Sequence, residues 1–341
     1  MTSGRTQVDV SVNPRGIHRT VEEAKSLVEW GAARVSIWDS PSRYADCWTT
    51  LGALSQHVTT RPLGVGVTNP VTRHPLVTAS AIASLHQASP SGSFLGVGTG
   101  DSGVVNLGRQ RATLGALEEY LGCVRALLHC GRAEWRGQEL VMERSGSSSP
   151  PIYLAAHGPR SLALAARIAD GAIVGIGFDR ASVDLAHRIV AEAAPARAAA
   201  GLPQLELWWN AGGIVVDDDE ERAVVRAGWL AAWAAHHLVN GKAGRASIPA
   251  ELRAGVVELA GSYDVGNHGM QSAARKRWYL DAARISGAWD YLGDRFLIAG
   301  TPDQVRTRLE QLRSLGVDRV SIGTEASGLE GVRDLLRLLD D

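Results

Sequence analysis

Gly64-Val65-Gly66-Val67-Thr68-Asn69-Pro70 is a short β-rich run that contains two glycines and ends in a polar pair. Glycine inside a strand pattern usually marks a bulge or a close approach by another group. Thr68 and Asn69 follow at the point where the strand should end. The alternative is an ordinary strand whose small residues fit the taper of a barrel. We expect this run to be a strand that ends beside a ligand.

The same succession of a β-rich run and an amphipathic helical run repeats on both sides of this stretch. The expected strands are 8–12, 34–38, 63–68, 94–98, 152–156, 172–174, one within 205–216, and 317–322. The expected helices are 20–30, 47–57, 76–87, 114–129, 161–169, 183–200 and 329–339. Eight strands alternating with helices predict an α/β fold, a (β/α)8 TIM barrel with parallel strands. A doubly wound sheet is the alternative, but no strand–GxGxxG–helix unit opens the chain.

Two stretches interrupt this alternation. Residues 131–151 are polar and end in Ser147-Ser148-Ser149-Pro150-Pro151, which predicts an exposed hairpin or loop. Residues from about 220 to 290 form a mostly helical insertion between the last strands. Long insertions at the carboxyl ends of barrel strands commonly wall or cover the site. We therefore expect a single barrel domain over residues 1–341 that carries this insertion.

Composition and charge exclude several classes of partner. The formal net charge of -1 gives no basic footprint for nucleic acid or anionic lipid. The three cysteines lack zinc-site spacing and fit a reducing cytoplasm. Residues 1–6 lack the apolar core of a signal peptide, and no apolar run approaches membrane-spanning length. We expect a cytoplasmic protein that acts on a small molecule, without nucleic-acid or membrane partners.

In a barrel of this kind, function lies at the carboxyl ends of the strands. Those ends are polar and rich in glycine: Ser11, Asn13, Trp38, Asp39, Thr68, Asn69, Gly100, Asp101, His157, Gly158, Gly175, Gly177 and Trp208 to Asn210. They lack the clustered histidines and carboxylates of a metal site, so no metal is expected. The chain has no GxSxG motif and no cysteine with a positioned histidine, which argues against acyl-transfer chemistry.

Ala156-His157-Gly158-Pro159 ends one strand and opens a helix. Glycine lets the backbone approach a ligand closely, proline suits the first helical turn, and a helix N-terminus attracts an anion. Gly175-Ile176-Gly177, after the next strand, predicts a second backbone donor site by the same reasoning. A glycine turn without a ligand is the alternative there.

Four segments carry a resemblance to a known family: 66–75, 95–102, 151–160 with 169–171, and 296–305. In their order and spacing they resemble the bacterial luciferase-like superfamily. Within it they resemble the methylene-tetrahydromethanopterin reductase-like branch, which uses coenzyme F-420. The resemblance spans nearly the whole chain, and it also implies a homodimer.

The resemblance implies a cis peptide bond between Gly66 and Val67, at a bulge that supports one face of a tricyclic ring. Thr68 and Asn69 would then hydrogen-bond the ring edge or the substrate. The cofactor phosphate would lie near Ala156, His157, Gly158 and Pro159. Trp38 and Asp39 complete the expected cofactor-binding set, with loop capping as the alternative for Asp39.

Asp101 is the main candidate for chemistry, because a carboxylate at a strand end could donate a proton or orient the ring. In the related reductases an aspartate at this place lies beside the deazaflavin. The alternative is that Asp101 caps the next segment through backbone amides. Those reductases carry a glutamate where Ser11 stands here, which puts the pterin substrate in doubt. His157 at the pocket rim and His268 in the insertion are further candidates.

The expected function is that of an F-420-dependent oxidoreductase. Hydride would pass between C5 of the deazaflavin and a C=N, C=C or C=O carbon of a small organic substrate. Asp101, Thr68 and Asn69 would be the catalytic residues. The rival is an FMN-dependent monooxygenase that receives reduced flavin from a separate reductase. A barrel that binds flavin without catalysis is a third possibility, which the loss of a carboxylate at Ser11 leaves open.

Overall fold

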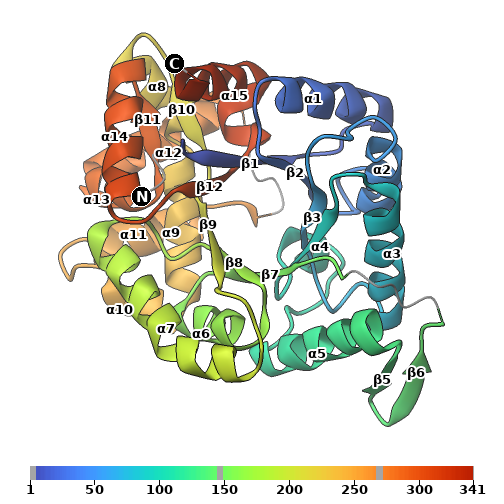
Figure 1. Ribbon diagram of the computed structural model, residues 1–341. Helices are drawn as coiled ribbons and strands as arrows, with labels where there is room; N and C mark the ends of the chain where they lie inside the picture. Colours follow the sequence, from blue (N-terminus) through green and yellow to red (C-terminus); the bar gives the residue numbers. More distant parts are fainter. Residues whose placement is uncertain (1–4, 144–148, 266–271, 341) are drawn as a thin grey trace.

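Eight parallel strands close into a barrel at the centre of the computed structural model, which describes residues 5–143, 149–265 and 272–340 (Figure 1). Around the barrel the strands follow the order β1-β12-β9-β8-β7-β4-β3-β2. They are β1 (Gln7–Val12), β2 (Arg34–Ile37), β3 (Leu63–Thr68), β4 (Ser93–Val97), β7 (Ile152–Ala156), β8 (Gly171–Val174), β9 (Glu206–Asn210) and β12 (Arg319–Gly323). The expected (β/α)8 barrel is confirmed.

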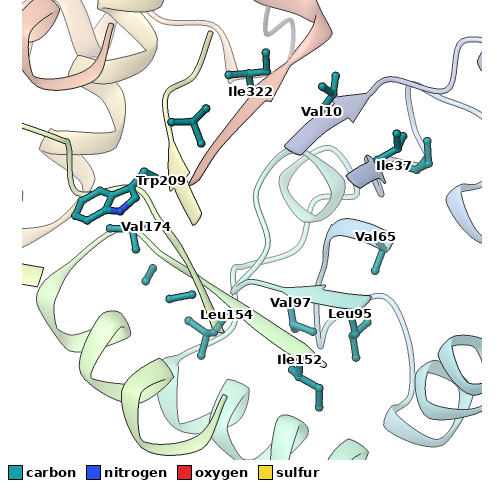
Figure 2. Close-up of a cluster of buried hydrophobic side chains, with 14 of the residues drawn as sticks. Val10, Ile37, Val65, Leu95, Val97, Ile152, Leu154, Val174, Trp209 and Ile322 are labelled. Carbon is teal, nitrogen blue, oxygen red and sulfur yellow. The ribbon is translucent and has the colours of Figure 1, made fainter. Parts of the chain in front are cut away.

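The outer face of the barrel is apolar on every strand. Successive residues of a strand face opposite sides of the sheet, so every second side chain points toward the surrounding helices. Figure 2 shows such side chains from all eight strands: Val10, Ile37, Val65, Leu95, Val97, Ile152, Leu154, Val174, Trp209 and Ile322. All are buried in one continuous core with the helices, and this layer holds the barrel together.

The inner face is different, because its amino-terminal half is filled around a buried arginine. The guanidinium of Arg34 lies 4.2, 4.5 and 3.8 Å from the ring centroids of Phe94, Tyr153 and Trp208. It also forms an ion pair with Asp9 at 3.2 Å. We call these five residues the lower interior layer, and they pack this end of the barrel.

Helices α1 (Ile17–Glu29), α2 (Cys47–Leu54), α3 (Pro75–Ala88), α5 (Leu114–Cys130), α6 (Pro159–Ile168), α7 (Arg180–Ala199), α14 (Pro302–Ser314) and α15 (Thr324–Asp340) surround the barrel. Several begin at capping side chains; Asp46 accepts the Thr49 N–H at 2.8 Å at the start of α2. No helix in the described ranges is long and apolar enough to cross a membrane. The expected hairpin is present as β5 (Arg132–Trp135) and β6 (Gln138–Val141), which project from the barrel (Figure 1).

The insertion between β9 and β12 builds a second buried core beside the barrel. It contains α8 (Glu220–Ala227), α9 (Leu230–Asn240), α10 (Lys242–Ser247), α11 (Arg253–Gly261), α12 (Ala273–Ile285) and α13 (Ala288–Phe296). The single strand expected within 205–216 is two strands, β9 and β10 (Ile214–Val216). Gly212, with φ of 62°, turns the chain between them. β10 pairs in parallel with β11 (Ile298–Gly300), a small sheet that the alternation did not predict.

Candidate functional site

Two connected hollows open at the carboxyl ends of the strands. The larger, which we call the outer cavity, has a volume of about 740 Å³ and lies between strand ends and the α9–α10 segment. The smaller, the inner chamber, has a volume of about 160 Å³ and reaches toward β1 and β12. Both are bordered by the same seven residues: Trp38, Gly66, Val67, Ala155, His157, Asn210 and Trp233. These shared walls make the two hollows one site.

The Gly66–Val67 peptide bond is cis, which confirms the expected position. The pairing of β3 with β4 shifts register between Val65 and Thr68, so the bulge is present too. Gly66 lies so close to β2 that an added Cβ would stand 2.8 Å from the Ser36 side chain. Gly66 and Val67 therefore present a bulge with little side-chain bulk at the boundary of the two hollows.

Thr68 lies behind this bulge and has no exposed surface. Its hydroxyl donates to Asp39 Oδ2 at 2.6 Å. Asp39, at the end of β2, borders the outer cavity. Burial raises the pKa of Asp39, and hydrogen bonds from Thr68 and Cys47 oppose that rise. The structure thus places Thr68 as a partner of Asp39 rather than on the cavity wall, and it gives the wall an acid that holds its proton more tightly than usual.

Asn69 borders the outer cavity and is almost fully buried. Its side-chain oxygen accepts the backbone N–H groups of Val71 and Thr72, each at 3.0 Å. This oxygen therefore fixes the turn that follows β3.

Asp101 stands at the cavity rim, between β4 and the short helix α4 (Ser102–Val105). Its carboxylate does not cap α4 but pairs with Arg111, which also borders the cavity. About a third of the surface of both side chains is exposed. The capping alternative is therefore wrong, and Arg111 is a site residue that the sequence did not single out.

His157 joins the barrel to the insertion. Its ring stacks on that of His237 from α9, with centroids 4.7 Å apart and planes inclined by 23°. His237 in turn contacts Trp233 edge-on, at 4.7 Å between centroids. Desolvation by the surrounding protein lowers the pKa of His157, and the negative charge of Asp101 opposes that change. A neutral imidazole is therefore favoured on the cavity wall.

The sequence did not single out Trp233 and His237, although their spacing of four residues gave a signal. Residues four apart in a helix lie on one face, and Asn240 continues that face one turn later. All three border the outer cavity, followed by Lys242 at the start of α10.

The expected phosphate region lies at one end of the outer cavity. Gly158, Pro159, Arg160 and Ser161 border it at the start of α6. A Cβ added to Gly158 would meet nothing within 4 Å, so open space faces this helix terminus. Ala156 does not take part: it is fully buried in the outer core, because β7 alternates and Ala155 faces the cavity instead.

Gly175, Ile176 and Gly177 do not border the cavity. The Gly175 N–H donates to the Ala156 carbonyl at 2.9 Å, and the Ile176 carbonyl accepts from Arg295 at 3.0 and 3.1 Å. Gly175 also supports the site from behind, since an added Cβ would stand 2.4 Å from the His157 ring. The structure therefore places these three residues behind the cavity wall rather than on it, and Gly175 makes room for the His157 ring.

Two further expectations concern histidine and metal. His268 lies outside the described residues. Across the described ranges, no group of three histidine, cysteine or acidic side chains is arranged to hold a metal ion.

Comparisons with known proteins agree with this architecture. The chain is 27% identical over 299 residues to the 5,10-methylenetetrahydromethanopterin reductase of Methanolobus tindarius, covering 82% of each chain. It superposes on the coenzyme F-420-dependent tetrahydromethanopterin reductase of Methanopyrus kandleri with a TM-score of 0.72 and 22% identity, covering 98% and 97% of the two chains. It superposes on a monooxygenase from Streptomyces bottropensis with a TM-score of 0.63 and 19% identity, covering 97% of each.

A family model described as luciferase-like monooxygenase matches residues 1–319. This match confirms the superfamily expected from the four sequence segments. Because it extends over nearly the whole barrel and its insertion, the chain is an enzyme that belongs to the luciferase-like monooxygenase family.

Proposed function

We propose that this enzyme is an F-420-dependent oxidoreductase acting on a small organic substrate. The observation that carries the proposal is the shape of the outer cavity, bounded by the Gly66–Val67 bulge and, at one end, by the N-terminus of α6. A flat ring with a phosphate-bearing tail fits such a site. The structure from Methanopyrus kandleri is that of a coenzyme F-420-dependent tetrahydromethanopterin reductase, and the relative from Methanolobus tindarius is named as the same kind of reductase. Together they support the deazaflavin over FMN.

The residues present fit such a cofactor. Gly66 and Gly98 add no side chain to this wall; a Cβ on Gly98 would stand 3.2 Å from the Val67 side chain and 3.3 Å from that of Ala155. At the α6 end, the helix dipole and Arg160 favour an anion. Arg111 and Lys242 add positive charge to the cavity wall.

The bound cofactor would supply the hydride chemistry, toward a C=N, C=C or C=O carbon of the substrate. The chain's own residues would orient the reactants and manage protons. Asp101, held by Arg111, would fix the position of a polar group at the rim. Asp39, held by the Thr68 hydroxyl, would offer a carboxyl group at the cavity wall for a hydrogen bond or a proton transfer. Neutral His157 would accept or donate a hydrogen bond.

Fluorescence titrations with F-420 and with FMN, oxidised and reduced, test the proposal. We expect the dissociation constant of F-420 to be at least about a hundredfold lower than that of FMN. Tight FMN binding, together with oxygen uptake when reduced FMN and a substrate are added, would instead establish the monooxygenase alternative.

A substitution at Gly158 tests the position of the cofactor's anionic end. Aspartate is a good N-cap, so Gly158→Asp should keep α6 intact while it places a negative charge in the open space there. We expect F-420 affinity to fall at least about tenfold through charge repulsion. Gly16→Asp, at the N-cap of α1 and also in open space, is the matched control. Equal F-420 affinities in the two variants would show that the anionic end of the cofactor does not bind at the N-terminus of α6.

A further inference from the structure

The inner chamber holds a hydrogen-bond network that the proposed cofactor site does not use. Ser11 and Ser321 line the chamber from β1 and β12, and both are almost fully buried. Behind them lies Asp9, which is 1% exposed. The chamber has room for about five water-sized groups, taking about 30 Å³ for each. It can therefore take one small organic group.

Strand alternation brings these residues together. Asp9 and Ser11 lie two apart on the inner face of β1, and Arg34 and Ser36 lie two apart on the inner face of β2. Ser36 Oγ donates to Asp9 Oδ1 at 3.3 Å, and Ser321 Oγ donates to Asp9 Oδ2 at 3.0 Å. The hydroxyls of Ser11 and Ser36 are 2.6 Å apart.

The direction of the hydroxyl protons in this network depends on Ser36. By distance alone, either hydroxyl of the Ser11–Ser36 pair can be the donor. A serine hydroxyl has one proton, so when Ser36 donates to Asp9 it accepts from Ser11. In that arrangement Ser11 directs its proton away from the chamber, and Ser321 does the same by donating to Asp9. Both serines then present oxygen lone pairs to the chamber.

Glu325 and Asn210 add two further polar side chains to the lining. Glu325 borders the chamber, and its Oε1 accepts the Tyr44 hydroxyl at 2.6 Å. Asn210 Oδ1 accepts the Gly212 N–H at 2.9 Å, so the amide nitrogen is the Asn210 group suited to donate. Ser11, Ser321 and Glu325 thus give the chamber three acceptor side chains, and the buried Trp229 indole N–H, which has no partner within the described residues, is a donor beside Asn210. Ile173, Leu230 and Ile322 make part of the remaining wall apolar.

We propose that Ser36, acting between Asp9 and Ser11, is a positioning residue that makes the inner chamber selective for a substrate bearing a hydroxyl group. The alcohol form can donate its proton to a serine or to Glu325 and accept from Asn210. The matching ketone has no proton to donate, so it would leave the oriented serine oxygens unpaired. This inference rests on the proposed function, because it assigns the inner chamber to the substrate of that reaction.

The test uses cofactor-free full-length protein with cyclopentanol and cyclopentanone as probes of nearly equal size. Tryptophan fluorescence reports binding, because Trp38, Trp229 and Trp233 line the chamber. We expect cyclopentanol to bind about tenfold more tightly than cyclopentanone, the effect of a hydrogen bond to an oriented acceptor. Equal binding, tighter binding of the ketone, or no binding of either probe would overturn the proposal.

Ser36→Ala separates positioning from a merely structural role. Ser36 does not line the chamber, so its loss leaves the chamber's shape in place. Without its partner, the Ser11 hydroxyl can turn toward the chamber and donate, so ketone affinity should rise and the tenfold preference should fall to about twofold or less. Ser55→Ala removes another buried serine hydroxyl, one bonded to the Gly52 carbonyl in α2, and should keep the wild-type preference.

An unchanged preference in Ser36→Ala would overturn the proposal. The F-420 titration is a separate measurement, so the two hypotheses fail separately. Weak F-420 binding with a clear alcohol preference would reject the cofactor but keep the chamber's selectivity. Tight F-420 binding without the alcohol preference would keep the cofactor and reject the chamber's selectivity.

Discussion

Arg34 and Ser36 stand two residues apart on the inner face of β2, and they belong to different halves of the barrel interior. Arg34 lies among three aromatic rings and an aspartate in the packed lower layer. Ser36 lies against Gly66, where the interior becomes hollow. The same strands thus supply large, closely packed side chains at one end and small ones at the other. The difference shows how one barrel separates stability from binding along its axis.

The largest effect should come from breaking the lower layer. Arg34→Met would leave Asp9 buried without its cationic partner, and the expected loss in free energy of unfolding is about 3–5 kcal/mol. Urea denaturation measures it. The double variant Asp9→Asn/Arg34→Met should recover part of that loss, because no buried charge is left unpaired. A loss below about 1 kcal/mol in the single variant would show that the layer is not a stabilising core.

The Asp101–Arg111 pair at the rim should behave in the opposite way. Asp101→Asn should change the free energy of unfolding by less than about 1 kcal/mol, because the pair is partly exposed. It should slow hydride transfer by about a hundredfold if Asp101 positions the reacting groups. Single-turnover absorbance of F-420 with the preferred alcohol measures this rate. Asp294→Asn, which breaks the exposed pair with Arg308, is the control; equal rates in the two variants would remove Asp101 from the mechanism.

Neighbouring alanines of β7 give a sharper version of the same comparison. Ala155 borders both hollows and Ala156 faces the packed outer core. Ala155→Leu should weaken F-420 binding by at least about tenfold, because it fills the site, with little loss of stability. Ala156→Leu should cost about 1–3 kcal/mol of unfolding free energy by overpacking, while folded protein keeps its affinity. Similar results in both variants would contradict the assigned orientations.

The smallest expected effect concerns Asp39. Its pKa is raised above the unfolded value, so ionising it costs free energy in the folded state, and stability falls as the pH rises through the folded pKa. Asp39→Asn removes that cost. The variant should be more stable than wild type at pH 7, by less than about 1 kcal/mol, and the difference should vanish near pH 4. Denaturation across this pH range would show no such trend if Asp39 were solvated.

The sequence predicted the eight barrel strands because their outer faces carry regular apolar residues, as at Val8, Val10 and Val12. It also brought Asp101, His157 and Gly158 into one cavity, because the carboxyl ends of parallel strands meet at one face. The alternation of β7 also indicates which alanine faces the cavity, Ala155 rather than Ala156. Ile152 and Leu154 face outward, so Ala156 must do so too.

Other parts of the site depend on tertiary packing that no local pattern shows. Arg111 reaches the rim from the connection after α4, and Lys242 comes from the insertion. At Thr68 the local rule fails because the bulge interrupts the alternation of β3: Gly66 and Val67 both border the hollows, and Thr68 turns toward Asp39. Ser36 gave no signal, since its role depends on contacts among three strands.

The packed layer around Arg34 determines where ligands can enter and leave the barrel. With that end of the barrel filled by three rings and an ion pair, the two hollows communicate with solvent from the carboxyl-terminal side. Cofactor, substrate and product would then share the approach beside α9 and its His157–His237 contact. A molecule bound in the outer cavity would then block exchange of one bound in the inner chamber. The closed end of the barrel thereby sets the order in which cofactor and substrate bind and product leaves.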